Sequence, residues 1–103
     1  MTLNYRYWIT FRLKQNATWN ARYSALIAAL NRIGSNFWNE PTSFVAFDSV
    51  HLIDAVANSL KTAIDPTTDI LLLVLSDTEK CRYIGTPENL SAFKHQFPFA
   101  KKV

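Results

Sequence analysis

Apolar and polar side chains alternate along residues 5–14 of this sequence. Successive side chains of a β-strand point to opposite faces of the sheet, so the alternation predicts a half-buried strand. One face would carry Tyr5, Tyr7, Ile9, Phe11 and Leu13, and the other Arg6, Trp8, Thr10, Arg12 and Lys14.

After this strand, apolar residues recur at steps of three and four as far as Ile33, which predicts a helix. Its apolar positions are Trp19, Tyr23, Leu26, Ile27, Leu30 and Ile33. Asn16 or Thr18 can cap the start of the helix, and Gly34 offers a left-handed residue at its end.

Two short aromatic or β-branched segments follow, at residues 36–39 and 43–47, separated by residues 40–42. Because Pro41 cannot donate to a central ladder, these segments predict a hairpin. A second helix is then expected, capped by Asp48 or Ser49 and stopped before Pro66. Its apolar side carries Leu52, Ile53, Val56, Leu60 and Ile64.

Residues 69–76 contain an unbroken apolar run, which predicts the most buried strand. Residues 80–84 favour a further short strand. Thr86 and Pro87 are typical of a helix start, and Pro98 would stop that last helix after Leu90, Phe93 and Phe97.

The order strand, helix, strand, strand, helix, strand predicts an α+β protein with a ferredoxin-like βαββαβ sandwich. An additional short strand and helix would follow at the C-terminal end, and residues 1–103 would form a single domain. Two crossover helices cover only one face of such a sheet. The bare face therefore predicts a homodimer.

Composition agrees with a packed core, since 49% of the 103 residues are hydrophobic and 14% aromatic. No signal peptide or membrane anchor is recognised in the sequence, and the longest apolar run is too short to span a bilayer. With the single Cys81, a cytoplasmic location is expected. The formal charge of +3 permits contact with phosphates and raises the nucleic-acid hypothesis slightly.

The basic and aromatic stripe of the first strand is the first candidate site, formed by Arg6, Trp8, Arg12 and Lys14. On an exposed sheet face, these side chains could contact the phosphates and bases of RNA or DNA. The alternative is a dimer interface, where Trp and Arg are also enriched, and we favour that alternative.

The remaining chemistry-bearing residues favour ordinary structural roles. Acidic residues are scattered, and Asp48, Asp65 and Asp69 fall where caps and turns are expected, so no metal site and no cofactor is predicted. His51 and His95 are interpreted as surface residues, and Cys81 as a small buried side chain. Gly34 and Gly85 lie too far apart to form a phosphate-binding loop.

The order of segments resembles the CRISPR-associated protein two superfamily, including SinR-like proteins and virulence-associated protein D toxins. The resemblance covers about residues 5–84, and its main carriers are residues 37–45, with the sequence Phe-Trp-Asn-Glu-Pro-Thr-Ser-Phe-Val, and the apolar run at 69–74. It implies a homodimer in which a C-terminal strand crosses to the partner's sheet. The candidates for that strand are Cys81, Arg82, Tyr83 and Ile84.

Metal-dependent nucleases of that superfamily carry an Asp at the end of the first strand, where this chain has Arg12 or its neighbours. A guanidinium would repel a divalent cation, so the resemblance gives no catalytic residue here. The leading hypothesis is a noncatalytic homodimeric module that holds nucleic acid or a protein partner. The alternatives are a small metal-dependent nuclease or toxin using Asp48 or Asp77, and a small-ligand regulatory domain.

Overall fold

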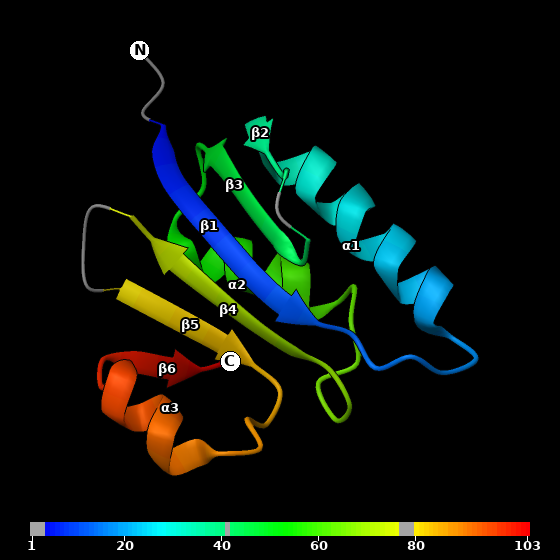
Figure 1. Cartoon of the computed structure of the whole chain (residues 1–103). Helices are drawn as coiled ribbons and strands as arrows, with labels where there is room; N and C mark the ends of the chain where they lie inside the picture. The colour runs from blue at the N-terminus through cyan, green and yellow to red at the C-terminus, as the bar shows by residue number, and fades with distance from the viewer. Residues whose placement is uncertain (1–3, 41, 77–79) are drawn as a thin grey trace.

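The structure, a computed structural model, describes residues 4–40, 42–76 and 80–103 (Figure 1). Over those residues its elements are β1 (Tyr5–Arg12), α1 (Trp19–Ile33), β2 (Ser35–Trp38), β3 (Phe44–Ser49), α2 (Ile53–Lys61), β4 (Ile70–Leu75), β5 (Lys80–Ile84), α3 (Leu90–Gln96) and β6 (Ala100–Lys102). The expected α+β class is confirmed. In the part of the chain just defined, no helix is both long and apolar enough to cross a membrane.

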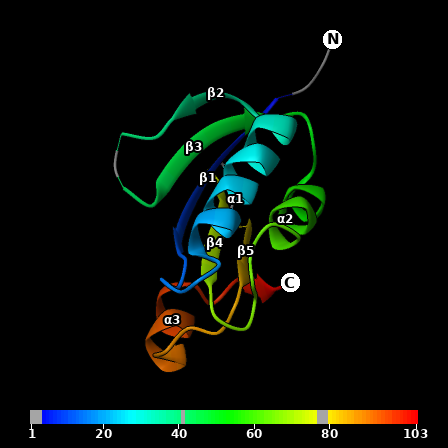
Figure 2. The ribbon, with the colours of Figure 1, turned by 90° about the vertical axis from the view of Figure 1, so that its right-hand side faces the viewer.

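The strands form one mixed sheet in the order β2-β3-β1-β4-β5-β6. Neighbouring strands are antiparallel from β2 to β5, and β6 pairs with β5 in parallel. Figure 2 shows α1 and α2 together on one side of the sheet and α3 on the other. We call the sheet face opposite α1 and α2 the open face.

The main core lies between the sheet and the helix pair α1 and α2. The alternation of β1 places Tyr7, Ile9 and Phe11 in this layer, and the inward faces of β3, β4, β5, α1 and α2 contribute further members. The most deeply buried apolar members include Ile9, Leu26, Val56, Leu60, Leu71 and Leu73, all with 0% exposure. Burial of each such aliphatic side chain contributes roughly 1.5–3 kcal/mol, which makes this layer the main source of stability.

A second, smaller cluster lies on the open face beneath α3. Leu72, Cys81 and Tyr83 form its buried part, and Phe93 of α3 packs with its ring centroid 4.8 Å from that of Tyr83. The helix α3 therefore covers β4 and β5 on this side. Over β1, β3 and β2 the open face carries no helix of the described residues (Figure 1).

Several expected helix ends are wrong. Gly34 follows α1 in an extended conformation, with φ −135° and ψ 175°, rather than a left-handed one. Asp48 and Ser49 belong to β3, and Leu52 is the residue before α2. The Ser49 hydroxyl instead donates to the Ile33 carbonyl over 2.6 Å, so it satisfies the end of α1 rather than the start of α2.

The last part of the chain also departs from expectation. The helix α3 begins at Leu90, because Asn89 caps it by accepting a hydrogen bond from the Ala92 amide, whereas Thr86 and Pro87 precede it. The strand β6 was not expected. Its short length, three residues, gives no readable alternation. Pro41, Asp77 and Glu79 lie outside the described residues.

Gly85 joins β5 to the following segment at a point where no other residue fits. Its φ is +99°, and a Cβ atom there would lie 1.8 Å from the backbone oxygen of Asp69. A positive φ of this kind favours glycine, and the close approach excludes any side chain. Gly85 thereby allows the end of β5 to pack directly on the start of β4.

We predict that Gly85→Ala destabilises the fold by roughly 2–4 kcal/mol, since it adds both backbone strain and a steric clash. Urea unfolding measures the change. Gly34→Ala is the comparison: its φ is negative, and its closest clash is with the Phe47 ring at 2.9 Å, so we expect a smaller loss. An equal or smaller loss for Gly85→Ala would contradict this packing.

Candidate functional site

Three of the four residues of the predicted stripe share the open face. Arg6, Trp8 and Arg12 point away from α1 and α2, because their neighbours Tyr7, Ile9 and Phe11 face the core. Arg6 and Arg12 are exposed and Trp8 is half-buried. Lys14 follows β1, is exposed, and donates its backbone N–H to the Asp69 carboxylate over 2.8 Å.

Trp8 lies in a continuous row of aromatic rings across three strands. Its ring stacks on Phe44 of β3, with centroids 5.6 Å apart and planes 25° apart. Phe44 in turn meets Trp38 of β2 edge to face at 5.8 Å. We call Trp8, Phe44 and Trp38 the aromatic row. Trp38 is 49% exposed, so the row ends in an accessible indole.

Strand register brings these rings together. Thr10 pairs with Phe44, and Ala46 pairs with both Trp8 and Trp38. A small alanine between two tryptophans leaves room for both indoles to lie over β3. The sequence placed Trp8 in a stripe along one strand but could not predict this row, because local periodicity does not determine the register between strands that are distant in sequence.

The charges around the aromatic row come from both ends of β1. Arg12 forms an ion pair with Glu88 over 3.1 Å, and both side chains are more than half exposed. Arg6 lies opposite Asp48 in the register, while Asp48 accepts a hydrogen bond from the Asn36 side chain over 2.9 Å. Exposed ion pairs of this kind contribute little to stability, so these groups remain available for a ligand.

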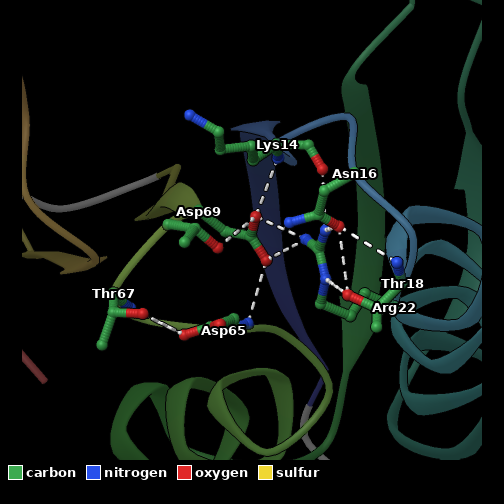
Figure 3. Close-up of polar contacts among 8 residues, drawn as sticks. Lys14, Asn16, Thr18, Arg22, Asp65, Thr67 and Asp69 are labelled. Carbon is green, nitrogen blue, oxygen red and sulfur yellow. Dashed lines mark hydrogen bonds and ion pairs between the residues drawn. The ribbon is translucent and has the colours of Figure 1, made fainter.

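Below the end of β1, the buried carboxylate of Asp69 holds several segments together (Figure 3). It accepts hydrogen bonds from the backbone N–H groups of Lys14 and Asp65, at 2.8 and 2.9 Å. Arg22 Nη1 lies 2.5 Å from both of its oxygens. The Asp69 side chain is fully buried and that of Arg22 is 11% exposed.

The other nitrogens of Arg22 are also used. Nη2 donates to the Lys14 carbonyl over 2.7 Å and to the Asn16 side chain over 2.6 Å, and Nε donates to the Thr18 hydroxyl over 3.0 Å. One guanidinium thus ties the loop between β1 and α1 to the start of α1. Such a fully bonded buried pair fixes geometry, and its charges are satisfied internally.

These contacts decide the ionisation of Asp69. Burial alone would raise the pKa of this carboxyl group, because it disfavours the charged form. Hydrogen bonds from the Asp65 and Lys14 backbone and from Arg22 outweigh burial and hold the pKa below its ordinary value. The network is therefore a structural cluster with a stably ionised acid.

A cavity of about 760 Å³ opens between the end of β1, the start of α1, the hairpin and the segment before α3. Its walls include aromatic, hydroxyl and charged side chains. They are contributed by Phe11, Arg12, Leu13, Lys14, Gln15, Trp19, Tyr23, Ser43, Thr67, Thr68, Asp69, Thr86 and Glu88. Two residues of the predicted stripe, Arg12 and Lys14, thus border a concave site that sequence reasoning did not find.

The predicted dimer strand is β5, which pairs within its own chain with β4 on one edge and β6 on the other. Cys81 and Tyr83 lie buried under α3, Ile84 lies in the main core, and Arg82 donates to Asp54 of α2 over 2.7 Å. Burial raises the pKa of the Cys81 thiol to about 11, which disfavours a reactive thiolate. Exchange of this strand between copies stays a prediction.

The acids considered for a metal site do not gather in the described part of the chain. Asp48 lies on β3 beside Asn36, and Asp77 lies outside the described residues. Across residues 4–40, 42–76 and 80–103, no group of three His, Cys, Asp or Glu side chains is placed to hold a metal ion.

Comparison with known proteins adds no relative: no protein-family model, no curated protein and no solved structure matches this chain. The resemblance noted from the sequence stays a prediction. The aromatic row and the cavity therefore have to be interpreted from their own chemistry.

We predict that Asp69→Asn destabilises the protein by about 3 kcal/mol near neutral pH, because it leaves the Arg22 guanidinium buried without its counterion. Since the pKa of Asp69 is lowered in the folded state, its contribution is present above the ordinary carboxyl pKa and is lost as pH falls through the folded value. Urea unfolding between pH 7 and pH 2 measures this.

The stability gap between the original chain and Asp69→Asn should therefore shrink below about pH 4. Glu88→Gln is the control, because it removes an acid from an ion pair with Arg12 that is exposed at both ends, 56% for Arg12 and 82% for Glu88. We expect only a small effect there. A gap at Asp69 that stays constant down to pH 2 would contradict the role of its charge.

Proposed function

We propose that this protein is a noncatalytic module that binds single-stranded nucleic acid on the open face of its sheet. The observation that carries the proposal is the aromatic row, which crosses three strands on a face that no helix of the described residues covers at that point. Stacking of bases on such rings contributes about 1–3 kcal/mol per base and tolerates any sequence.

The positions of the charges support the same ligand. Arg6 and Arg12 lie on the open face on either side of Trp8, and the six residue steps between them along β1 correspond to about 20 Å. An extended strand of a few nucleotides spans that distance, with bases over the aromatic row and phosphates near the two guanidinium groups. The net charge of +3 favours an anionic partner in general.

The geometry also favours single-stranded nucleic acid over a duplex. The Trp38 ring is 49% exposed and the Trp8 ring is half-buried. Aromatic rings on a sheet face can stack only with bases that are not already stacked in a helix. The proposal contains no chemical step, since the charged groups that we place on this face are two arginines and Asp48, which is held by Asn36. From the sequence, nucleic-acid binding was one of two interpretations of the stripe, and the dimer interface was the favoured one; the proposal takes up the former and adds Phe44 and Trp38.

We further propose that β1 to β4 with α1 and α2 form a ferredoxin-like unit. The order β2-β3-β1-β4 with antiparallel neighbours throughout supports this. The strand β5, the helix α3 and the strand β6 would then extend that unit at one edge. Homodimerisation and a cytoplasmic location stay predictions. A second copy seated on the open face would compete directly with nucleic acid.

Substitution of the exposed end of the aromatic row tests the function. We predict that Trp38→Ala weakens binding of a 12-nucleotide single strand with a 5′-hydroxyl end by about tenfold, as the loss of one stacked base implies. Fluorescence anisotropy with labelled RNA and DNA of mixed sequence measures the affinity. Gel filtration of the same variant reports on association of the protein itself.

The matched control is Phe37→Ala. Phe37 is the neighbouring aromatic on β2 and is 38% exposed, but its ring lies 6.2 Å from that of Phe47 on the helix side of the sheet. We expect this variant to bind as the original chain does. Equal losses for both variants, or a Trp38→Ala variant that dissociates a dimer while no strand binds, would refute the proposed function.

The basic residues give a second readout in the same assay. Arg6→Gln should weaken binding and reduce the dependence of affinity on salt by roughly one phosphate contact, which is about 0.7 in the logarithmic slope for single strands. Arg32→Gln, at an exposed position in the last turn of α1, should leave both quantities unchanged. An unchanged slope for Arg6→Gln would remove Arg6 from the binding surface.

A further inference from the structure

The cavity at the end of β1 adjoins the open face but has a chemistry of its own. Segments that are distant in sequence meet there: Lys14 follows β1, Ser43 comes from the hairpin, Thr68 precedes β4 and Thr86 follows β5. Its volume of about 760 Å³ falls within the range of small-molecule sites. The Asp69 network fixes three of these segments relative to one another, because its hydrogen bonds join the loop after β1 to α1 and to the chain before β4.

One wall of the cavity is aromatic. The rings of Trp19 and Tyr23 stack in α1, with centroids 5.3 Å apart and planes 19° apart, and Phe11 lies 6.4 Å from Tyr23. Tyr23 is 40% exposed and Trp19 is half-buried. A planar ligand can therefore lie against this wall.

The lining also has a polar part, which bears the positive charge. It includes the hydroxyl residues Ser43, Thr68 and Thr86 and the cations Arg12 and Lys14. The Asp69 carboxylate is neutralised by Arg22 within hydrogen-bonding distance, so it repels an anion only weakly. Helix α1 begins at this cavity with no acidic residue in its first turn, which further favours negative charge.

The second acid of the lining, Glu88, acts against an anion through its ion pair with Arg12. That pair is exposed at both ends, 56% for Arg12 and 82% for Glu88, so it is weak. A phosphate carries more charge than a carboxylate and offers more oxygens to a guanidinium. It can replace Glu88 on Arg12 without disturbing the Asp69 network.

We propose that this cavity binds a nucleoside monophosphate, with the base against Trp19 and Tyr23 and the phosphate held by Arg12 and Lys14 in place of Glu88. The ligand is either a free nucleotide or the phosphorylated end of a bound strand. Only the second source rests on the proposed function, because Arg12 also borders the open face. Glu88 then acts as an internal competitor that sets the affinity.

Binding of adenosine 5′-monophosphate to the full chain, followed by isothermal titration calorimetry, tests the site. We expect Glu88→Gln to tighten binding several-fold and Lys14→Gln to weaken it about tenfold, which corresponds to about 1.4 kcal/mol. Asp54→Asn is the matched control, because it also removes the acid of an ion pair, with Arg82 over 2.7 Å, and neither residue lines the cavity. That variant should bind as the original chain does.

Adenosine and inorganic phosphate, tested separately, should each bind much more weakly than the nucleotide, because each contacts only part of the lining. Nucleotide binding no tighter than that of inorganic phosphate would overturn the proposal. So would an affinity that Glu88→Gln leaves unchanged or lowers.

A single strand with a 5′-phosphate, compared with the same strand ending in a 5′-hydroxyl, separates the two sources. If the phosphorylated strand binds more tightly, and Glu88→Gln increases this difference in affinity, the cavity binds strand ends. If the two strands bind equally and the free nucleotide still binds, the cavity binds free nucleotides. If the nucleotide binds as expected and the 5′-hydroxyl strand does not bind, the open-face function is wrong and the cavity site stands. The reverse result refutes the cavity site alone.

Discussion

The buried carboxylate of Asp69 is the contact on which the arrangement of this protein depends. It receives the Lys14 backbone from the end of β1, the Arg22 side chain from α1 and the Asp65 backbone from the chain before β4. Its own backbone oxygen lies so close to Gly85 that only glycine fits there. Four segments of the chain thus meet at Asp69, and these contacts fix the end of β1 relative to α1 and β4.

The contacts at the end of β1 also determine where Arg12 and Lys14 lie. Arg12 is the last residue of β1 and is on the open face, and both Arg12 and Lys14 line the cavity. The Asp69 carboxylate pairs with Arg22 and not with the side chains of Arg12 and Lys14. The cation of the buried network and the cations of the proposed binding surfaces are therefore separate groups.

The sheet itself is asymmetric in its cover. The helices α1 and α2 bury one face completely enough to form the main core, whereas α3 covers only the β4 and β5 part of the other. The remaining part carries the aromatic row, in which Trp8 and Phe44 are half-buried and Trp38 is exposed. Exposed apolar surface of this kind often marks a contact with another molecule. One side of the sheet thus forms the main core that stabilises the fold, and the opposite side carries the surface proposed for binding.

Local sequence patterns were sufficient for the elements whose periodicity is strong. The alternation along β1, the apolar run of β4 and the spacing in α1 each gave the right kind of element, since burial of one face dictates them. The ends were less predictable: Ser49 has the composition of a helix cap but bonds to Ile33, and Thr86 with Pro87 precedes α3 without starting it.

Contacts between segments that are distant in sequence could not be predicted from local patterns. Arg22 and Asp69 are 47 positions apart, and Trp8 meets Phe44 only because of the register of β1 with β3. The predicted stripe therefore identified Arg6, Trp8 and Arg12 correctly as one face, but not the rings of Phe44 and Trp38 beside them. The cavity was missed for the same reason, since its walls come from five separate segments of the chain.

The most direct test of the central claim uses the three tryptophans as internal reporters. Trp8 and Trp38 belong to the aromatic row, whereas Trp19 lines the cavity beside α1. Two-dimensional ¹⁵N–¹H NMR can follow their indole N–H signals while a single strand with a 5′-hydroxyl end is added. The account predicts saturable shifts of the Trp8 and Trp38 signals with the Trp19 signal unmoved; shifts at Trp19 alone, or at none of the three, would contradict it.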